Sequence, residues 1–225
     1  MKVLIIDNGT SYLQQLGNLL SKHTLQVIKY SEIGSVDPND FDAIILSGGH
    51  AFTVEGHTAL LEKEIELVKG STRPIFGICF GFEVIAQAFG AKLEPMNSKE
   101  HGILDIEVIE PDDIFLNINS FQVFESHRWV VKKLPKDFIS LARSKDGIEA
   151  IKHKTRPVYA VQFHPEMFTE ESCGDEILNN FLNIIQKESL RRATLIASAG
   201  ASTRLAGSKL SDEQVEEISK FSVQK

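Results

Sequence analysis

The run Pro74-Ile75-Phe76-Gly77-Ile78-Cys79-Phe80-Gly81-Phe82 sets the architecture of this chain, because an apolar segment ends there in Gly-x-Cys-x-Gly. The next residues, Glu83-Val84-Ile85-Ala86-Gln87-Ala88-Phe89, have helical spacing. Glycines two positions before and after Cys79 allow a strand and a helix to pass closely at a sharp turn. The helix N-terminus points free N–H groups and its positive dipole end at the sulfur, which favours the thiolate. The motif predicts a nucleophilic cysteine, and a nucleophile implies an enzyme.

A buried structural cysteine is the alternative, so the prediction depends on finding a base for the thiol. His164 follows the β-branched and aromatic run 157–163, which predicts a buried strand. Glu166 lies two residues further on and suits an acceptor that holds the imidazole in one tautomer. The alternatives are a histidine that caps a strand and a solvated loop charge. We predict a triad of Cys79, His164 and Glu166 that only folding can bring together.

Four ordered motifs connect the chain to a known family. Gly77-Ile78-Cys79-Phe80-Gly81 and Gln162-Phe163-His164-Pro165-Glu166 together resemble the class I (triad) glutamine amidotransferases. Asp42-Ala43-Ile44-Ile45-Leu46-Ser47-Gly48-Gly49 resembles the strand and turn that supply part of that family's oxyanion hole. Glu125-Ser126-His127 and its flanks resemble the glutaminase part of GMP synthetase. The resemblance covers residues 1–188.

The resemblance implies a reaction and a role for each motif. The thiolate of Cys79 would attack the side-chain amide carbon of glutamine and expel ammonia, and water would then hydrolyse the γ-glutamyl thioester. His164 would shuttle the proton while Glu166 orients the imidazole. The oxyanion hole would consist of the backbone N–H groups of Gly49 and Phe80, although an ordinary strand-end turn is the alternative for Gly48-Gly49. The implied substrate-binding residues are Ser47, Gly48, Glu83, Ser126, His127, Arg128 and Trp129.

Two positions depart from the family's pattern near the predicted substrate site. His50 stands where the family usually has proline, so it is an extra imidazole near the site or a surface histidine. Glu83 stands where the family usually has glutamine. An ionised carboxylate only accepts hydrogen bonds, whereas an amide also donates them. Glu83 could hold a substrate ammonium group but would repel a carboxylate, so we expect an altered substrate affinity or identity.

A third departure concerns the partner. In GMP synthetases an acidic residue that faces the synthetase follows the Ser-His pair closely, but here Arg128-Trp129 follows it. The resemblance places backbone groups of Ser126, Arg128 and Trp129 near the amino-acid end of the substrate. Simple packing or a partner surface is the alternative role for Trp129, the only tryptophan.

The motifs together predict the glutaminase component of an amidotransferase. It would hydrolyse L-glutamine through a Cys79 thioester to glutamate and ammonia for an ATP-dependent synthetase on a separate chain, with the conversion of XMP to GMP as the implied use. One alternative is a stand-alone hydrolase of γ-glutamyl amides or peptides, which Glu83 and the missing acidic residue favour. Another is a catalytically silent regulatory or scaffold homologue, against which the intact triad counts.

Composition narrows the protein class further. The chain has 225 residues, 42% of them hydrophobic, which is enough to bury one sizeable core. A net charge of −7 argues against a broad nucleic-acid surface. Cys79 and Cys173 make no disulfide framework, and a required thiolate fits the reducing cytoplasm. The apolar run before Asp7 is too short for a signal peptide, and no segment has the length of a membrane span.

We expect no metal and no cofactor. His50, His57 and His101 are scattered along the chain, and Cys173 lacks a ligand partner at useful spacing. No glycine-rich phosphate loop of the Walker or dinucleotide type is present. ATP chemistry would therefore belong to another chain.

The hydrophobic pattern predicts an α/β fold. Strands are expected at 2–7, 24–29 and 43–46, and helices at 10–22, 55–69 and 174–190, while 103–163 is strand-rich. The alternation predicts an open, mostly parallel central sheet flanked by helices, with ligands beyond the carboxyl ends of its strands. The resemblance implies a flavodoxin-like amidotransferase fold with a strand-rich second half.

The sequence predicts one folded domain followed by a C-terminal tail. Residues 1–190 are predicted to form the glutaminase domain. Residues 191–225 are predicted to be a C-terminal tail, a linker rich in Ala, Ser and Gly that leads to a short helix at Ser211-Asp212-Glu213-Gln214. Of the two interpretations, we favour a disordered or loosely docked tail over an ordered one.

Overall fold

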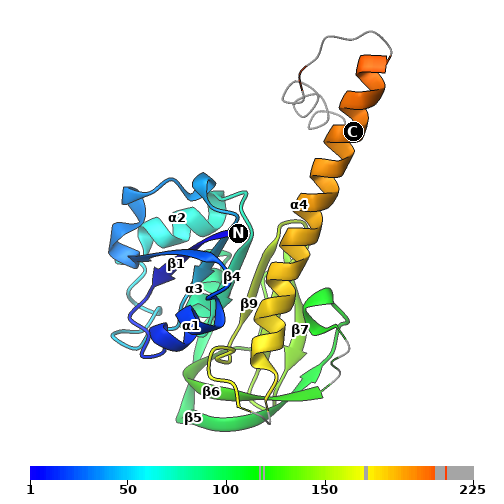
Figure 1. The fold of residues 1–225 in the computed structure, drawn as a ribbon. Helices are drawn as coiled ribbons and strands as arrows, with labels where there is room; N and C mark the ends of the chain where they lie inside the picture. The colour runs from blue at the N-terminus through cyan, green and yellow to red at the C-terminus, as the bar shows by residue number, and fades with distance from the viewer. Residues whose placement is uncertain (117, 119, 170–171, 206–210, 212–225) are drawn as a thin grey trace. The chain divides into compact units, whose positions relative to one another are not determined.

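The computed structural model describes residues 1–116, 118, 120–169, 172–205 and 211. Its regular elements alternate between strand and helix in the first half and are mostly strands in the second (Figure 1). They are β1 (Lys2–Asp7), α1 (Leu13–Leu19), β2 (Thr24–Lys29), the 3-10 turns η1 (Tyr30–Ser35) and η2 (Pro38–Asp40), β3 (Ala43–Leu46), α2 (Glu62–Gly70), β4 (Ile75–Ile78), α3 (Phe80–Ala88), β5 (Leu93–Val108), η3 (Asp113–Phe115), β6 (Ser120–Val131), β7 (Phe138–Arg143), β8 (Ile148–His153), β9 (Val158–Val161) and α4 (Gly174–Leu205).

One nine-stranded sheet runs through the molecule in the order β2-β1-β3-β4-β9-β8-β7-β5-β6. The first five strands in that order are parallel, and β4 pairs with β9 so that Gly77 lies opposite Ala160. The carboxyl ends of β3, β4 and β9 therefore meet at one edge of the sheet. The parallel sheet expected from the sequence is confirmed.

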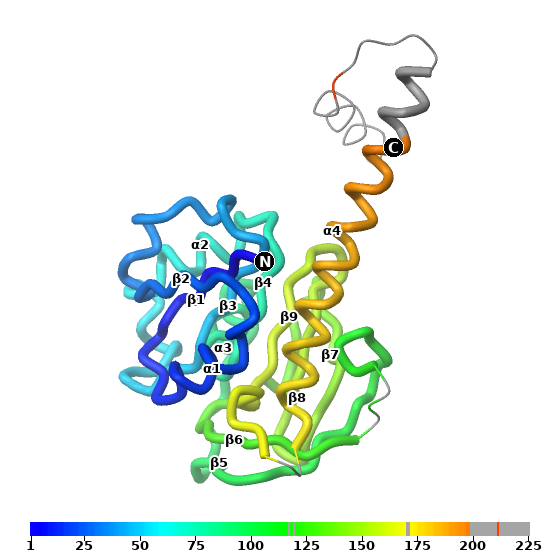
Figure 2. The backbone as a smooth tube through the Cα atoms, viewed as in Figure 1, coloured from blue at the N-terminus to red at the C-terminus, as the bar shows by residue number. Residues whose placement is uncertain are grey.

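The other four strands make an antiparallel extension of the same sheet. β9 pairs with β8, β8 with β7, β7 with β5, and β5 with β6, all antiparallel (Figure 2). The longest strands are β5 and β6, whose register shifts between Pro95 and Glu100. The strand-rich half predicted for 103–163 is present, but it begins earlier, at Leu93.

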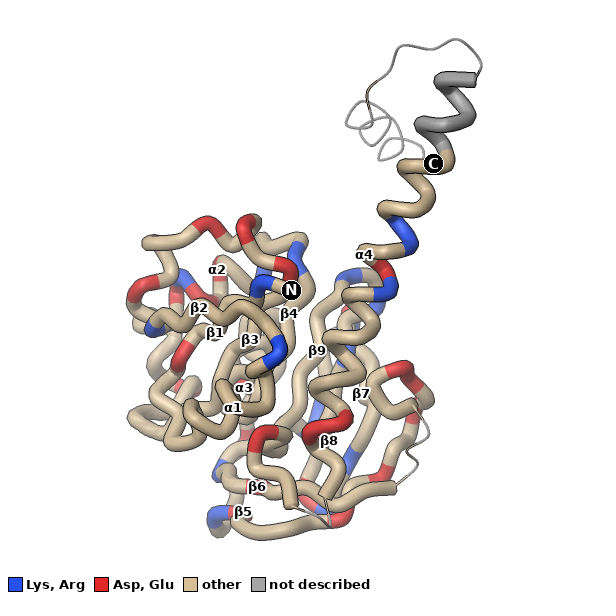
Figure 3. Tube along the Cα trace, in the orientation of Figure 1, with Lys and Arg blue, Asp and Glu red and all other residues tan. Residues whose placement is uncertain are grey.

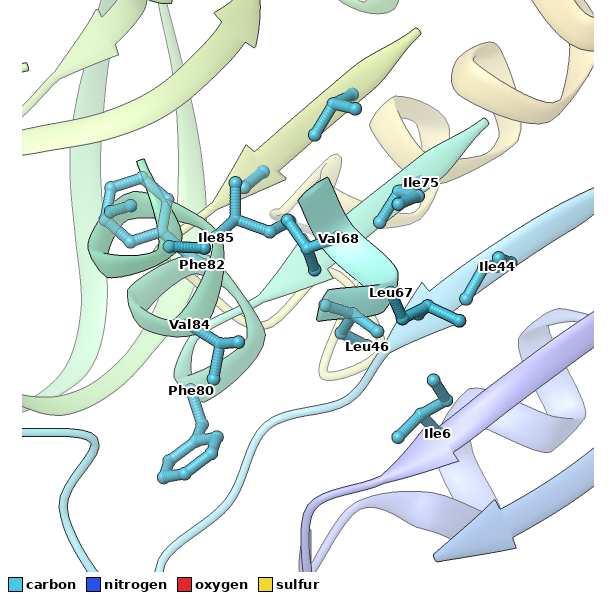
Figure 4. Close-up of a cluster of buried hydrophobic side chains, with 14 of the residues drawn as sticks. Ile6, Ile44, Leu46, Leu67, Val68, Ile75, Phe80, Phe82, Val84 and Ile85 are labelled. Carbon is cyan, nitrogen blue, oxygen red and sulfur yellow. The ribbon is translucent and has the colours of Figure 1, made fainter. Parts of the chain in front are cut away.

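The core packs against the parallel half of the sheet. Figure 4 shows Ile6, Ile44 and Ile75 of the strands beside Val68 of α2 and Ile85 of α3, all buried. Neighbouring residues of a strand point to opposite faces. Phe76 accordingly faces away from α3, and its ring lies 5.0 Å from that of Phe181 in the first part of α4.

Two predicted helices are shorter than their sequence patterns. The helix expected at 10–22 forms only over Leu13–Leu19, and the helix expected at 55–69 begins at Glu62. Before Glu62 the backbone turns at Gly56, which has a φ of +80°. An α-helix cannot pass through that conformation, so the apolar spacing of 55–61 belongs to a turn.

The last helix is longer than predicted. Instead of ending at residue 190, α4 continues to Leu205 through a segment rich in alanine, the strongest helix former. The chain divides into two compact units, residues 1–182 and residues 183–225. A boundary at residue 190 stays a prediction. The short helix is predicted to start at Ser211, and the residues after Ser211 lie outside the described part of the chain.

Positions of both charge signs occur throughout the described chain. Figure 3 shows Lys and Arg positions interspersed with Asp and Glu positions on both halves of the sheet. Among the described residues, no helix is both long enough and apolar enough to cross a membrane.

Candidate active site

The turn from β4 to α3 is a strained elbow that presents Cys79. This residue has φ 48° and ψ −100°, and it is the one non-glycine residue with a positive φ in the described chain. A Cβ on Gly77 would lie 2.7 Å from the carbonyl of Gly81, and a Cβ on Gly81 would lie 2.5 Å from the carbonyl oxygen of Leu46. Only glycine fits at either position, which is why the Gly-x-Cys-x-Gly pattern predicted the turn.

Backbone hydrogen bonds fix the elbow to its neighbouring strands. Cys79 N donates to the Val161 carbonyl at 2.8 Å, at the end of β9. Gly81 N donates to the Ser47 carbonyl at 3.2 Å, just after β3. Gly49 lies two residues after Ser47 in the sequence, and a Cβ on Gly49 would be 3.1 Å from the Phe80 ring. The two segments with the predicted oxyanion-hole amides, Gly49 and Phe80, are therefore adjacent.

His164 and Glu166 form a buried, hydrogen-bonded pair beyond the end of β9. His164 Nδ1 lies 2.9 Å from Glu166 Oε1, and both residues are at most 4% exposed. The carboxylate selects the tautomer with the proton on Nδ1, which leaves Nε2 free to act as a base. His164 N also donates to the Phe124 carbonyl at 2.9 Å, and the Tyr12 ring packs edge-on at 5.0 Å. The imidazole is thus held on several sides.

The surroundings of the thiol oppose its ionisation. Burial raises the pKa of Cys79 well above its ordinary value, and the negative charges of Glu83, Glu125 and Glu166 raise it further. The N–H of Phe80 donates to the sulfur and acts in the other direction. The amide at the helix N-terminus thus favours the thiolate as expected, but burial and the nearby carboxylates outweigh it and leave the pKa of the thiol raised.

A cavity of about 290 Å³ opens beside Cys79. Most of the predicted substrate-site and oxyanion-hole residues line it, namely Gly49, Phe80, Glu83, Ser126, His127, Arg128 and Trp129. Exposed Lys99 also lines it, and sequence reasoning missed this residue because nothing local distinguishes it from other surface lysines. His50, which stands where the family usually has proline, also lines the cavity, and its side chain is exposed.

Glu83 is a buried acid in the wall of this cavity. Burial raises its pKa to about 8, while the charge of His127 and a hydrogen bond from Gln162 act in the opposite direction. Gln162 Nε2 lies 3.5 Å from Glu83 Oε1 and 3.8 Å from Cys79 Sγ. One amide therefore connects the acid to the nucleophile.

The remaining predicted residues, Ser47 and Gly48, lie behind the site. The hydroxyl of Ser47 donates to the Gly48 carbonyl at 2.8 Å and accepts from Asn8 N at 2.9 Å. A Cβ on Gly48 would lie 2.9 Å from the His164 ring. Neither residue lines the cavity, so their contacts support the loop and the imidazole.

A buried polar network next to this loop has no local signature in the sequence. Asn8 Nδ2 donates to Glu64 Oε1 at 3.0 Å and to the Ser47 carbonyl at 3.2 Å. Burial raises the pKa of Glu64 to about 7, while the Asn8 hydrogen bond lowers it. The network fastens α2 to the loop after β3.

Cys79 follows β4, and the His164–Glu166 pair follows the neighbouring strand β9. The family described as glutamine amidotransferase class-I matches residues 4–185, and the chain belongs to that family.

Its relatives carry a more particular name. The chain is 36% identical over 190 residues to one subunit of the glutamine-hydrolyzing GMP synthase of Pyrococcus abyssi, covering 81% of this chain and 97% of that protein. It is 34% identical over 190 residues to the corresponding subunit from Methanocaldococcus jannaschii, covering 81% and 96%. The crystal structure of a GMP synthase subunit protein from Thermoplasma acidophilum matches with a TM-score of 0.76 and 28% identity, covering 86% of this chain and 98% of that one.

Proposed function

We propose that this chain is the glutamine-hydrolysing subunit of a GMP synthase, with ammonia as its product. The observation that carries the proposal is that the strained elbow of Cys79 and the His164–Glu166 pair follow the adjacent parallel strands β4 and β9 at the same edge of the sheet. In this mechanism Cys79 attacks the amide carbon, His164 carries the proton to the leaving ammonia, and Glu166 stabilises the imidazolium. The amides of Gly49 and Phe80 receive the oxyanion.

The charges of the cavity suit a free amino acid as the substrate. Lys99 and Arg128 line its exposed part, while Glu83 lies buried beside the nucleophile. A zwitterion offers a carboxylate to the lysine and arginine, and its ammonium group or side-chain amide can donate to Glu83. L-glutamine provides all of these groups and fits a cavity of about 290 Å³.

The ammonia acceptor belongs to another chain under this proposal. The Pyrococcus and Methanocaldococcus relatives are each named as one subunit of a GMP synthase, and this chain covers nearly all of their length. We therefore propose a separate ATP-dependent subunit that converts XMP to GMP with the ammonia released here. A function that needs the free thiol of Cys79 suits the reducing cytoplasm.

Ammonia release from L-glutamine by the purified chain is the direct test. We expect turnover that falls at least about 10³-fold in Cys79→Ala, because the covalent route is lost. ATP and XMP together with the synthetase subunit should stimulate the rate. Turnover unchanged in Cys79→Ala, or no turnover even with the synthetase subunit, would contradict the proposal.

A stand-alone γ-glutamyl hydrolase is the second candidate, and Glu83 is the observation that favours it. A buried carboxyl beside the thiol changes how the amino-acid end of a substrate is held. γ-Glutamyl dipeptides offered in competition with glutamine separate the two functions. A preference for the dipeptides would support the hydrolase, and a preference for glutamine would support the glutaminase of a synthase.

A further inference from the structure

Three buried side chains with metal-ligand chemistry converge beneath the substrate cavity. Glu125 and His127 lie on β6, and Glu149 lies on β8. One ligand atom from each lies within 4.8 Å of the other two. All three residues are at most 4% exposed. The proposed glutaminase reaction assigns no role to Glu125 or Glu149.

Several atoms of this Glu125–His127–Glu149 cluster lack hydrogen-bond donors within the described part of the chain. Neither oxygen of Glu125, nor Oε2 of Glu149, accepts a hydrogen bond from a group outside the cluster; within it, the Glu125 and Glu149 carboxyls interact with each other, and Glu125 Oε2 lies 3.3 Å from His127 Nε2. Ser144 Oγ donates to the other oxygen of Glu149 at 2.6 Å and fixes that carboxyl in place. Buried carboxylates without donors are costly, because nothing replaces the water that they lose. Protons or a metal ion between these oxygens would therefore lower the free-energy cost of burying them.

The orientation of His127 indicates which positive charge fits. Its Nδ1 lies 2.9 Å from the Trp129 carbonyl, and a carbonyl can only accept, so this nitrogen carries a proton. The other ring nitrogen, Nε2, lies 3.3 Å from Glu125 Oε2, so either a second ring proton or a metal ion bound through the Nε2 lone pair occupies the space between them. Two bare acceptors at this distance would repel one another. Fixing the distal nitrogen through a carbonyl is the usual second-shell arrangement of a metal-bound histidine.

We propose that Glu125, His127 and Glu149 bind one divalent first-row transition-metal ion, with Zn²⁺ as the reference ion. One imidazole and two carboxylates are a mixed nitrogen and oxygen donor set of the kind that Zn²⁺, Fe²⁺ and Mn²⁺ accept. Glu100 and Asp146 lie near Glu125, but both are paired with the exposed Lys145 ammonium, at 3.7 and 3.9 Å. The proposal therefore rests on the three buried side chains alone.

The site lies behind the wall of the cavity and is separate from the nucleophile. His127 lines the cavity, whereas Glu125 and Glu149 do not. The ion would therefore stabilise the wall that carries Ser126 to Trp129 without touching the substrate. No spacing motif signals the site, since His127 and Glu149 are 22 residues apart. The expectation of no metal site considered scattered histidines and Cys173, and it missed carboxylates brought together by strand pairing.

Metal stoichiometry and affinity of the full chain test this proposal independently of the glutaminase function. A Cys79→Ala background removes the competing thiolate ligand. After chelation and dialysis, we expect calorimetric titration with Zn²⁺ to give one ion per chain. Glu125→Gln and Glu149→Gln should each weaken the affinity at least about tenfold. Glu64→Gln is the matched control, because it changes another buried glutamate outside the cluster and should leave Zn²⁺ binding unchanged.

Any other result of the Zn²⁺ titration would contradict the proposed metal site. No saturable binding of Zn²⁺ or Mn²⁺ would mean that protons on the imidazole and on the two carboxyls satisfy the cluster without a metal ion. Equal affinity in both variants and the control would place the ion elsewhere. Should the variants not fold, anomalous diffraction at the zinc edge from Cys79→Ala crystals grown with equimolar Zn²⁺ decides the matter. A peak between the three side chains supports the proposal, whereas a peak elsewhere, or none, refutes it.

Discussion

Cys79 combines a strained backbone with a thiol that its surroundings keep protonated. The positive φ is energetically unfavourable for a residue with a side chain, and such strain concentrates at functional sites. With this raised pKa, we expect the proposed nucleophile to form only on transfer of the thiol proton to His164. Reactivity at this residue therefore depends on the charges around it, and Glu83 is one that can be removed without changing the size of the side chain.

We predict that Glu83→Gln raises the rate of glutamine hydrolysis by about two- to tenfold, because one charge that raises the thiol pKa is lost. Glu83 has a pKa of about 8, so it is mostly neutral at pH 6.5 and mostly ionised at pH 9. The gain should accordingly be larger at pH 9. Initial rates of ammonia release at the two pH values measure it.

Glu166→Gln is the matched control for that substitution. It also removes a carboxylate that raises the thiol pKa, but it takes away the charge that stabilises the imidazolium, and the amide can present its NH₂ group to Nδ1 and so favour the wrong tautomer. We expect a loss of at least about 10²-fold in kcat. A Glu83→Gln rate that equals or falls below that of the unchanged chain at both pH values would show that the charge is not what limits turnover.

The site residues that sequence reasoning predicted are those with a local signature. Cys79 has a glycine two positions away on each side, and His164 follows a strand, so neighbouring residues are enough to identify them. Glu149 and Lys99 have no such signature, since their place depends on how β5, β6 and β8 pair. Tyr12 was missed for the same reason, because its contact with His164 joins distant parts of the chain.

At the scale of elements, the elbow depends on the close approach of β3, β4 and α3. We predict that Gly81→Ala destabilises the fold by about 2 kcal/mol or more, because the added Cβ meets the backbone and side chain of Leu46. Gly17→Ala in α1 is the control, since open space surrounds that position and alanine favours helix. Urea unfolding measures both, and equal stabilities for the two variants would contradict the packing argument.

The same scale explains which elements could be predicted. The strands at 2–7 and 43–46 are right because a buried parallel strand has an uninterrupted apolar run. The helices were harder, because an apolar spacing persists through turns such as the one at Gly56. The extent of β5 could not be seen either, since its exposed first part pairs with β6 through backbone groups and needs no apolar pattern.

For the whole molecule, Glu64 makes stability depend on pH. Its pKa is 4.5 when unfolded and about 7 when folded, so the folded form keeps the proton longer. The free energy of unfolding should therefore fall between pH 4.5 and 7 and stay level above, a loss of about 3 kcal/mol from this group. Glu64→Gln keeps an oxygen for Asn8 and removes the ionisation.

We predict that Glu64→Gln is more stable than the unchanged chain at pH 8 and about equally stable at pH 4.5. Thermal unfolding at the two pH values measures the difference between the chains, which cancels the contribution of other buried acids. A gain of the same size at both pH values would mean that ionisation of Glu64 is not its cause.

The predicted domain boundary is testable at this scale too. We expect a chain that ends at residue 190 to keep its unfolding temperature within a few degrees and to keep its ammonia release, because residues 1–182 form a compact unit that contains the whole candidate site. A chain that ends at residue 168 is the control, since it lacks Phe181, which packs on Phe76. Loss of activity in the longer chain would move the boundary toward the C-terminus.

The carboxylates around Cys79 also affect the rate at which oxidants and electrophiles react with its sulfur. Peroxide and electrophiles attack the thiolate far faster than the thiol, and overoxidation of a catalytic cysteine is irreversible. A thiol whose pKa is raised by burial and nearby carboxylates exposes little thiolate to these reagents. We therefore expect peroxide to oxidise the resting protein more slowly than it would a protein with an exposed thiolate.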